Sequence, residues 1–469
     1  MKFINDKESK NKRRLTEELP TVGLVLFSSV IMLVVLVVVI VIVPSISILL
    51  LPPPPFSYAQ QQQKNDATDS SPSCITYDST DNIITISCDS SRLTDIDNQV
   101  KDANVIHKEE EKNTTTATAG DDHRGRGVWL LKAGIVIAKG AVLYINSTDT
   151  TWLKIIPDET SGNGIEVYGS LKIDSVKITS WNPGTNDYVK FKVKKIPPDE
   201  GEAAPYDKIP RPFIRVEHGA TGTTDITNSE IAYLGYDFIA KAGGTDLNYY
   251  GLNYYGGDGS IIRGNQIHDN RFGFYSAGVG GMILEDNHIY DNYMYGLDPH
   301  TGTHDMIIRN NTVHDSGTMG IICSLDCYNI TIEDNEVYNS FGSGIMFSRN
   351  MYNSIARNNY VHDETKCIFV SASHNNEIYN NTVSDCGNGI YLKADSSNNN
   401  VYGNTIINST SNGILVNTGS SDNTFSSNTI INATEFGINV DEDSVNNNNR
   451  FENNKLINSK VAGQQEGYE

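Results

Sequence analysis

The C-terminal half of the chain repeats one short pattern of hydrophobic and polar positions. Each repeat has an Asn, an aliphatic residue two positions after it, and usually a larger apolar residue three positions before it. The Asn column consists of Asn265, Asn287, Asn311, Asn335, Asn359, Asn381, Asn404, Asn428 and Asn454. Successive members are 22 to 26 residues apart. A sequence period in this range is typical of a solenoid.

A second column marks another bend of the same repeat. It contains Gly273, Gly296, Gly320, Gly344, Gly389, Gly413 and Gly437, with Cys367 where one Gly would fall. The residues between the columns form short β-type runs, and no amphipathic helix of three turns is predicted. We therefore expect an all-β fold, a β-solenoid with about 23 residues and three short strands per coil. A leucine-rich repeat is excluded because its consensus leucines are absent.

Short β-type runs begin at Val128, so we assign residues 128–465 to the β-solenoid domain. Residues 60–127 are rich in Gln, Asp, Ser and Thr and read as a polar linker, because they can bury little apolar surface. Within it, Cys74 and Cys88 flank a predicted small hairpin, and we expect a disulfide between them if the chain is exported.

The N-terminus carries an apolar run of membrane-spanning length. Residues 22–51 are uncharged and interrupted only by Pro44, and residues 1–20 before them are basic and expected to stay in the cytoplasm. Residues 21–59 are either a removed signal peptide, with small residues at Ser57 and Ala59, or an uncleaved transmembrane anchor. Both alternatives place the β-solenoid outside the cytoplasm, secreted or held at the cell surface.

Composition narrows the range of partners. The chain has 469 residues and a formal net charge of −21. Nucleic-acid binding needs clustered Lys and Arg, so we expect no nucleic-acid partner. Cys323, Cys327, Cys367 and Cys386 match no zinc spacing and are expected to be thiols or to form one disulfide.

The stacking of coils predicts which side chains meet. Equivalent positions lie one above another at about 4.8 Å, and side chains alternate between the two faces of a strand. Asp298 and His300 therefore share a face, which is the outer one if Leu297 points inward. Tyr275 would lie beside Asp298 on the preceding coil, and Tyr295 stands across the Gly296 bend.

An exposed Asp, His and Tyr on a flat β-surface suit a long polymer that lies across the coils. Histidine is the usual general base near neutral pH, and a tyrosine can exchange a proton from the opposite side. A carboxylate can orient the histidine, or meet an anionic substrate while protonated. The alternative is a surface turn in which Asp298 caps Pro299 and His300.

A second polar ladder stands three positions after the Asn column. It comprises His268, Tyr290, His314, Tyr338 and His362. Regular stacking on the solvent face and a row of metal ligands both fit this pattern, and stacking is the simpler hypothesis. We expect no metal or other cofactor. Calcium at the Asp and Asn bends is an alternative, although calcium motifs of β-solenoids are richer in Gly-Asp.

The segment Tyr295-Gly296-Leu297-Asp298-Pro299-His300 resembles the hallmark Tyr-Gly-x-Asp-Pro-His of the mannuronan (alginate) C5-epimerases. The likeness extends to residues 176–182, 233–236 and 272–275 and to His304, and is similar to the exported, non-modular branch of that family. The resemblance covers roughly residues 128–440. It implies a right-handed parallel β-helix and conversion of mannuronate to guluronate within the polymer.

The resemblance also implies roles for individual residues. His300 would be the base that removes the C5 proton, Asp298 a required partner, and Tyr295 or a water the acid on the other face. Tyr275 and His304 would contact the substrate. In the family, an Arg neutralises the uronate carboxylate. This chain has Leu325 at the corresponding position. Arg349, one coil later, is the candidate replacement, and Lys393 is a second.

The chemistry leaves three functions open. Removal of a proton alpha to a carboxylate requires that the carboxylate be neutralised and the enolate-like intermediate stabilised. Reprotonation from the opposite face gives epimerisation, whereas loss of the 4-O-linked sugar gives a polysaccharide lyase. A non-catalytic cell-surface β-helix that binds glycan is the third. In each case the expected partner is an anionic polysaccharide, with the membrane as a further partner if the apolar run is uncleaved.

Overall fold

The computed structural model describes residues 73–109, 127–158, 163–191, 209–236 and 249–461. All of them lie in one unit, Ser70–Glu469. The basic tail, the apolar run and the cleavage sequence predicted above lie outside the described residues. Within the described ranges, no helix is both long enough and apolar enough to cross a membrane.

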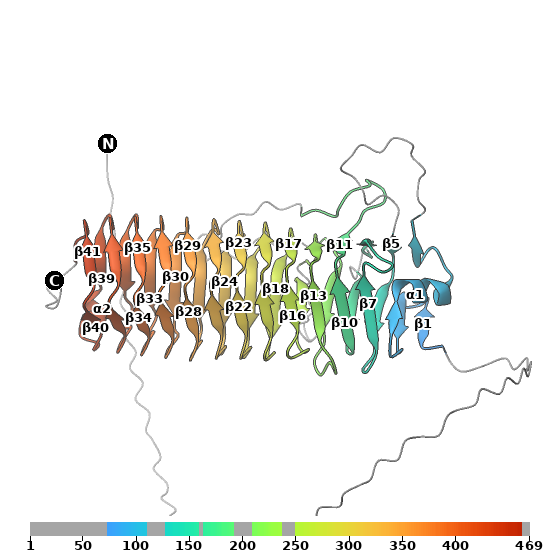
Figure 1. The fold of residues 1–469 in the computed structure, drawn as a ribbon, viewed down its shortest axis with the longest axis horizontal. Coiled ribbons are helices and arrows are strands. Elements are labelled where there is room, and N and C mark those ends of the chain that lie inside the picture. Colours follow the sequence, from blue (N-terminus) through green and yellow to red (C-terminus); the bar gives the residue numbers. More distant parts are fainter. Residues whose placement is uncertain (1–72, 110–126, 159–162, 192–208, 237–248, 462–469) are drawn as a thin grey trace, which may run out of the picture. The chain divides into compact units, whose positions relative to one another are not determined.

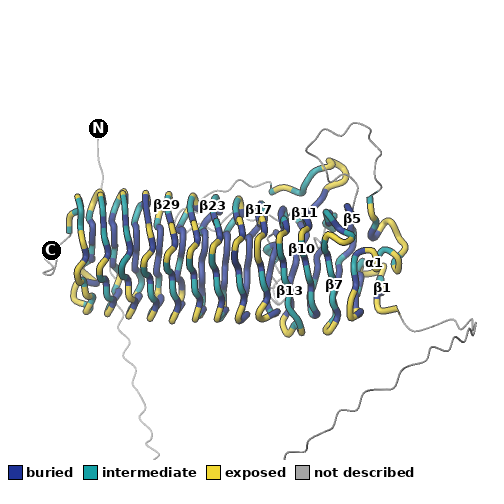
Figure 2. Tube along the Cα trace, viewed as in Figure 1, coloured by how far each residue is buried: buried dark blue, intermediate teal, exposed yellow. Residues whose placement is uncertain are grey.

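Each sequence repeat forms one coil of three short strands, and the coils stack into a right-handed parallel β-helix (Figure 1). The predicted fold class is therefore confirmed. Equivalent strands of successive coils pair in parallel, so the fold has three long sheets. Buried residues follow the strands and exposed residues gather where the coils bend (Figure 2).

Sheet 1 carries the candidate site and has 14 strands among the described residues. They are β1 (Ile75–Asp78), β2 (Ile83–Ile86), β6 (Gly134–Ile137), β9 (Gly164–Val167), β12 (Phe213–Val216), β15 (Gly251–Tyr254), β18 (Phe272–Ala277), β21 (Tyr295–His300), β24 (Met319–Ser324), β27 (Ser343–Ser348), β30 (Lys366–Ser371), β33 (Asn388–Lys393), β36 (Asn412–Val416) and β39 (Phe436–Val440).

Sheet 2 has 13 strands in the part of the chain that the structure describes. They are β3 (Ser91–Arg92), β7 (Val142–Asn146), β10 (Ser170–Asp174), β13 (Thr224–Thr227), β16 (Ile261–Arg263), β19 (Ile283–Glu285), β22 (Ile307–Arg309), β25 (Thr331–Glu333), β28 (Ile355–Arg357), β31 (Glu377–Tyr379), β34 (Asn400–Tyr402), β37 (Thr424–Ser426) and β40 (Arg450–Glu452). The short helix α2 (Glu442–Val445) precedes β40.

Sheet 3 has 14 strands over the same described ranges. They are β4 (Ile106–Lys108), β5 (Val128–Leu131), β8 (Trp152–Ile155), β11 (Lys177–Ser180), β14 (Glu230–Ala232), β17 (Gln266–His268), β20 (His288–Tyr290), β23 (Thr312–His314), β26 (Glu336–Tyr338), β29 (Tyr360–His362), β32 (Thr382–Ser384), β35 (Thr405–Ile407), β38 (Thr429–Ile431) and β41 (Lys455–Ile457).

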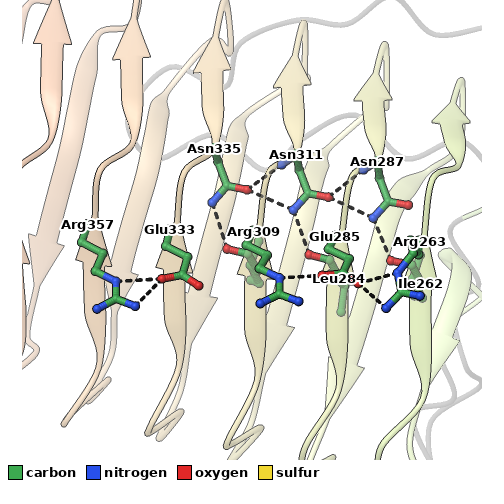
Figure 3. Close-up of polar contacts among 11 residues, drawn as sticks. Ile262, Arg263, Leu284, Glu285, Asn287, Arg309, Asn311, Glu333, Asn335 and Arg357 are labelled. Atoms are coloured by element: carbon green, nitrogen blue, oxygen red, sulfur yellow. Dashed lines mark hydrogen bonds and ion pairs between the residues drawn. The ribbon is translucent and has the colours of Figure 1, made fainter.

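The Asn column forms an internal amide ladder between sheets 2 and 3 (Figure 3). The Asn311 side-chain oxygen accepts from the backbone N–H of Asn287 at 3.0 Å and from its side-chain amide at 2.9 Å. The Asn287 amide also donates to the carbonyl of Ile262 at 2.9 Å. Each Asn thus hydrogen-bonds to buried backbone groups at a bend. These groups would otherwise have no partner, because the strand-to-strand hydrogen bonds stop there.

The Gly column marks positions where a side chain would strike the next coil. A Cβ added to Gly296 would lie 2.5 Å from both the Val313 side chain and the Gly320 carbonyl. The aliphatic residues that follow the Asn column, such as Ile289 and Val313, are fully buried in the interior. The Asn column lies at the bend between sheets 2 and 3. The Gly column lies within the strands of sheet 1, as Gly296 does in β21, so the second bend predicted from it is wrong.

One predicted boundary is wrong. Residues 73–109, assigned above to a polar linker, form the first strands of the β-helix and the helix α1 (Leu93–Val100). β2 pairs in parallel with β6, and Leu93 and Ile96 of α1 are fully buried. A disulfide joins Cys74 and Cys88 across the β1–β2 hairpin. The few apolar residues of this segment are scattered among Asp, Ser and Thr, and most of them are buried in the first coil.

Candidate active site

The candidate site lies on the outer face of sheet 1, in the registers that the sequence predicted. Tyr275 pairs with Asp298, and Ala277 pairs with His300, between β18 and β21. On the other side, His300 pairs with Ser324 of β24. Leu297 is fully buried in the interior, so the alternation of the strand turns Asp298 and His300 outward. Both residues lie inside β21, so the alternative of a surface turn capped by Asp298 is wrong.

Asp298 is buried, although the sequence analysis expected an exposed group. Only 2% of the residue is exposed, and its Oδ1 has no hydrogen-bond partner. Burial raises the pKa of the Asp298 carboxyl well above its usual range, against the opposing effect of the Arg349 charge. A raised pKa favours the protonated carboxyl, and a protonated carboxyl can donate a hydrogen bond.

His300 is held at both ring nitrogens. Its Nδ1 lies 2.5 Å from the Thr301 hydroxyl, and its Nε2 lies 3.0 Å from a guanidinium nitrogen of Arg349. A guanidinium only donates, so Nε2 is the acceptor and the imidazole is neutral with its proton on Nδ1. Burial, and then the nearby charge of Arg349, lower the pKa of His300 to about 4.

Arg349 reaches His300 from two coils away. It follows β27, and its Nε donates to the Ser324 hydroxyl at 2.8 Å. Ser324 stands between the two coils and is fully buried. Leu325, where the resembling family has Arg, occupies the equivalent turn one coil earlier. The guanidinium at His300 thus belongs to Arg349, the candidate predicted to replace the family Arg.

Tyr295 and Tyr275 complete the cluster on either side of Asp298. Tyr295 is half-buried, and burial raises the pKa of its phenol. Its ring packs edge-on against Phe272, with centroids 4.8 Å apart. The Tyr275 ring lies 5.6 Å from that of His300. The phenols therefore border the same outward face as Asp298 and His300.

Two candidate substrate contacts lie apart from this cluster. The Nδ1 of His304 lies 2.8 Å from the Asp305 carboxylate, and its ring stacks on Tyr328 at 4.9 Å, in a ladder at the next bend. Lys393 ends β33, four coils after His300 in the same row, or about 19 Å at the inter-strand spacing. Arg349, not Lys393, is the cation at His300.

Sequence reasoning missed two supporting hydroxyls, those of Thr301 and Ser324. Thr301 follows His300 directly, and Ser324 is its register partner on the next coil. The repeat spacing places Ser324 at the position equivalent to His300 on the next coil. Its role as a link to Arg349 was missed because an arginine side chain spans more than one coil.

The second polar ladder is a stack of rings. Tyr290 lies parallel to His268 and His314, with centroids 4.6 Å and 5.4 Å away. The ladder histidines lie close to the Asp that follows each, as His314 does to Asp315 at 2.6 Å. Such rings present edges to solvent rather than faces. Among the described residues, no three His, Cys, Asp or Glu side chains converge as a metal site requires.

The sequence matches a group of known enzymes over part of its length. It is 29% identical over 184 residues to a mannuronan C5-epimerase of Pseudomonas fluorescens, a match that covers 38% of this chain and 31% of that protein. A second, from Pseudomonas aeruginosa, is 27% identical over 186 residues and covers 38% and 30%. The chain thus spans about a third of the length of the curated relatives that it matches.

The resemblance to the mannuronan C5-epimerases is confirmed. The crystal structure of the periplasmic alginate epimerase AlgG superposes with a TM-score of 0.64 at 20% identity, over 81% of this chain and 85% of that one. This likeness shows a shared β-helix fold. A family model described as periplasmic copper-binding protein (NosD) matches residues 240–419.

Proposed function

We propose that the chain is a polysaccharide-modifying enzyme that epimerises uronate residues at C5, converting mannuronate to guluronate within the polymer. The observation that carries this proposal is the grouping of His300, Asp298, Tyr295 and Arg349 on one face of sheet 1. It supplies a base, a neutral acid, a phenol and a cation, which the reaction needs together. The relatives named mannuronan C5-epimerase support the same chemistry.

The cation and the neutral acid would act on the substrate carboxylate. Loss of the C5 proton sends its electron pair into the carboxylate, which becomes enolate-like and gains negative charge. Arg349 would pair with the carboxylate oxygens. Protonated Asp298 would donate a hydrogen bond to them, since its Oδ1 has no partner inside the protein. Both groups are in place before charge develops, which is the condition for electrostatic stabilisation.

The substrate would also prepare its own base. In the free protein, Nε2 of His300 is occupied by Arg349 and its pKa is about 4. A carboxylate that draws the guanidinium away frees Nε2 and removes one of the two causes of the low pKa. His300 then becomes more basic when the C5–H is presented to it. Tyr295 would return a proton to the opposite face of the carbanion, which inverts C5.

Proton NMR of polymannuronate incubated with the full chain in D2O tests this function, with His300→Ala alongside. Epimerisation predicts guluronate signals with deuterium at C5, absent from the variant. Unsaturated chain ends that absorb in the near ultraviolet would indicate a lyase instead. A wild-type protein that changes neither the signals nor the absorbance would contradict an enzymatic role on this polymer.

The cellular setting of this function is also a proposal. An exported protein, secreted or anchored by residues 21–59, would meet an anionic polysaccharide outside the cytoplasm. AlgG is described as periplasmic, which supports export of proteins with this fold and chemistry. In this mechanism Arg349 would supply the positive charge and Asp298 the hydrogen bond that a bound metal ion supplies in other enzymes.

A further inference from the structure

A cavity of about 500 Å³ opens beside the candidate site, on the coils that precede it. It is formed by the turns that follow β12, β15 and β18. Its lining consists of residues 219–223, residues 255–258 and Gly278. All of these lie within the described part of the chain. A volume of this size is within the range of small-ligand sites.

The cavity lies next to the coil that carries His300. Gly278 comes directly after Ala277, which pairs with His300. A Cβ at Gly278 would lie 3.8 Å from the carbonyl of Thr301, the residue after His300. The rings of Tyr255 and Tyr275 lie 5.9 Å apart, and Tyr275 lies 5.6 Å from His300. A ligand that fills the cavity therefore touches the wall that leads to the reacting imidazole.

The walls suit a sugar. The Asp258 carboxylate is exposed, and its Oδ1 accepts the Gly280 N–H at 3.0 Å, which fixes its direction. Carboxylates accept hydrogen bonds from hydroxyl groups strongly. The Lys139 ammonium lies 3.5 Å from where a Cβ of Gly219 would stand, so a cation borders the far turn. Glycines make up much of the remaining lining of the cavity, and they have no side chains to cover their backbone groups.

We infer that this cavity binds the sugar that adjoins the reacting uronate, on the side of the N-terminal coils. The inference rests on the proposed function, because a polymer that presents one residue to His300 must continue past it. Asp258 accepts hydrogen bonds from hydroxyl groups of the adjoining sugar. The negative charge of Asp258 repels the carboxylate of that sugar from the same wall. Lys139 receives the carboxylate. The cavity thus selects the orientation of the chain as it crosses the site.

Two variants test the cavity. Ala220→Trp places an indole among the lining residues, and Asp258→Asn keeps the acceptor for Gly280 while it removes the charge. Ala103→Trp is the matched control, because Ala103 is exposed on a turn of the first coil. Binding of a mannuronate hexamer to the full chain is measured by calorimetry. We expect affinity to fall at least tenfold in Ala220→Trp and about tenfold in Asp258→Asn, and to stay unchanged in Ala103→Trp.

The outcomes separate this inference from the proposed function. Wild-type affinity in both cavity variants would overturn the cavity as a subsite, whether or not the protein epimerises the polymer. Tighter binding in Asp258→Asn would also overturn it, since Asp258 would then only repel the polyanion. If the cavity variants lose binding and the wild type does not epimerise the polymer, the result would support the cavity as a sugar-binding site and contradict the proposed epimerisation. A wild-type chain that binds no hexamer contradicts both.

Discussion

At the scale of single residues, burial shifts the pKa values of the two central groups of the site in opposite directions. It raises the pKa of Asp298 well above its usual range, and burial together with the charge of Arg349 lowers the pKa of His300 to about 4. A carboxyl in water is charged near pH 7, and a histidine is half protonated near pH 6.5. Both shifts favour the uncharged forms of two groups on one strand.

The pH dependence of activity follows from the state of His300. Only the neutral imidazole can take a proton, so activity rises as pH increases through its pKa. With a pKa of about 4 in the free protein, we expect kcat/KM to retain its full value well below pH 6. Arg349→Gln removes the second cause of the low pKa, so its acid limb should move upward while its maximum falls. The profile of kcat/KM against pH measures both, and an unmoved limb would contradict the contact.

The state of Asp298 is tested by two substitutions. Asp298→Asn keeps an uncharged donor of the same shape, whereas Asp298→Ala removes the donor. If the carboxyl acts while protonated, the Asn variant should retain at least a tenth of kcat, and the Ala variant should lose roughly 10² to 10³-fold. Equal losses in the two variants would instead indicate that the negative charge is needed. Initial rates of the epimerisation assay distinguish these outcomes.

At the scale of elements, rows of like positions across many coils hold the sheets in register. On sheet 2, Arg263, Glu285, Arg309, Glu333 and Arg357 alternate in sign along consecutive strands (Figure 3). The buried Asn ladder runs beside them. A slip by one coil would place arginine against arginine, and like charges directly opposite each other destabilise paired strands. These rows therefore favour one stacking order.

An Asn of the buried ladder should contribute more to the free energy of unfolding than an exposed Asn does. In Asn335→Ala, the carbonyl of Ile308 and the amide of Asn311 lose their partners inside the protein. Buried polar groups without partners cost about 1–3 kcal/mol each, so we expect a loss of about 3 kcal/mol in the free energy of unfolding. Asn446→Ala, at an exposed position, is the control and should change it by less than about 0.5 kcal/mol. Urea unfolding followed by circular dichroism compares them.

At the scale of the whole described unit, the first coil protects the sheets at one end. β2, β3 and α1 cover the edges of β6 and β7 and the interior behind them. An uncovered end of a solenoid exposes unpaired backbone groups and apolar side chains, which favour self-association. Residues 73–109 are thus a cap rather than a linker, and the disulfide at Cys74 and Cys88 lies within this cap.

Loss of the cap should cause association without loss of the coils behind it. Leu93→Asp places a charge in the buried face of α1, so the cap should detach. Asn98→Asp adds the same charge to the exposed face of the same helix and is the control. Light scattering should show larger particles for Leu93→Asp alone, with circular dichroism still typical of β structure. Particles of equal size for the two variants would contradict a capping role.

The sequence alone determined the coil, its register and the face on which the candidate site lies. The Asn column recurs once per coil because its amides bond backbone groups at a bend, and the Gly column recurs because a side chain there would meet the next coil. Counting from them places Tyr275 beside Asp298, and Ser324 beside His300. These relations are local to neighbouring coils, so the period of the sequence contains them.

Only the tertiary structure decided how deeply the site is buried and what the cation contacts. Asp298 is only 2% exposed, and Arg349 spans two coils to reach His300; neither follows from the period. The cap was hidden for a similar reason, since its few apolar residues matter only when the first coil is there to receive them. Register depends on spacing along the chain, whereas burial and side-chain reach depend on which surfaces meet in space.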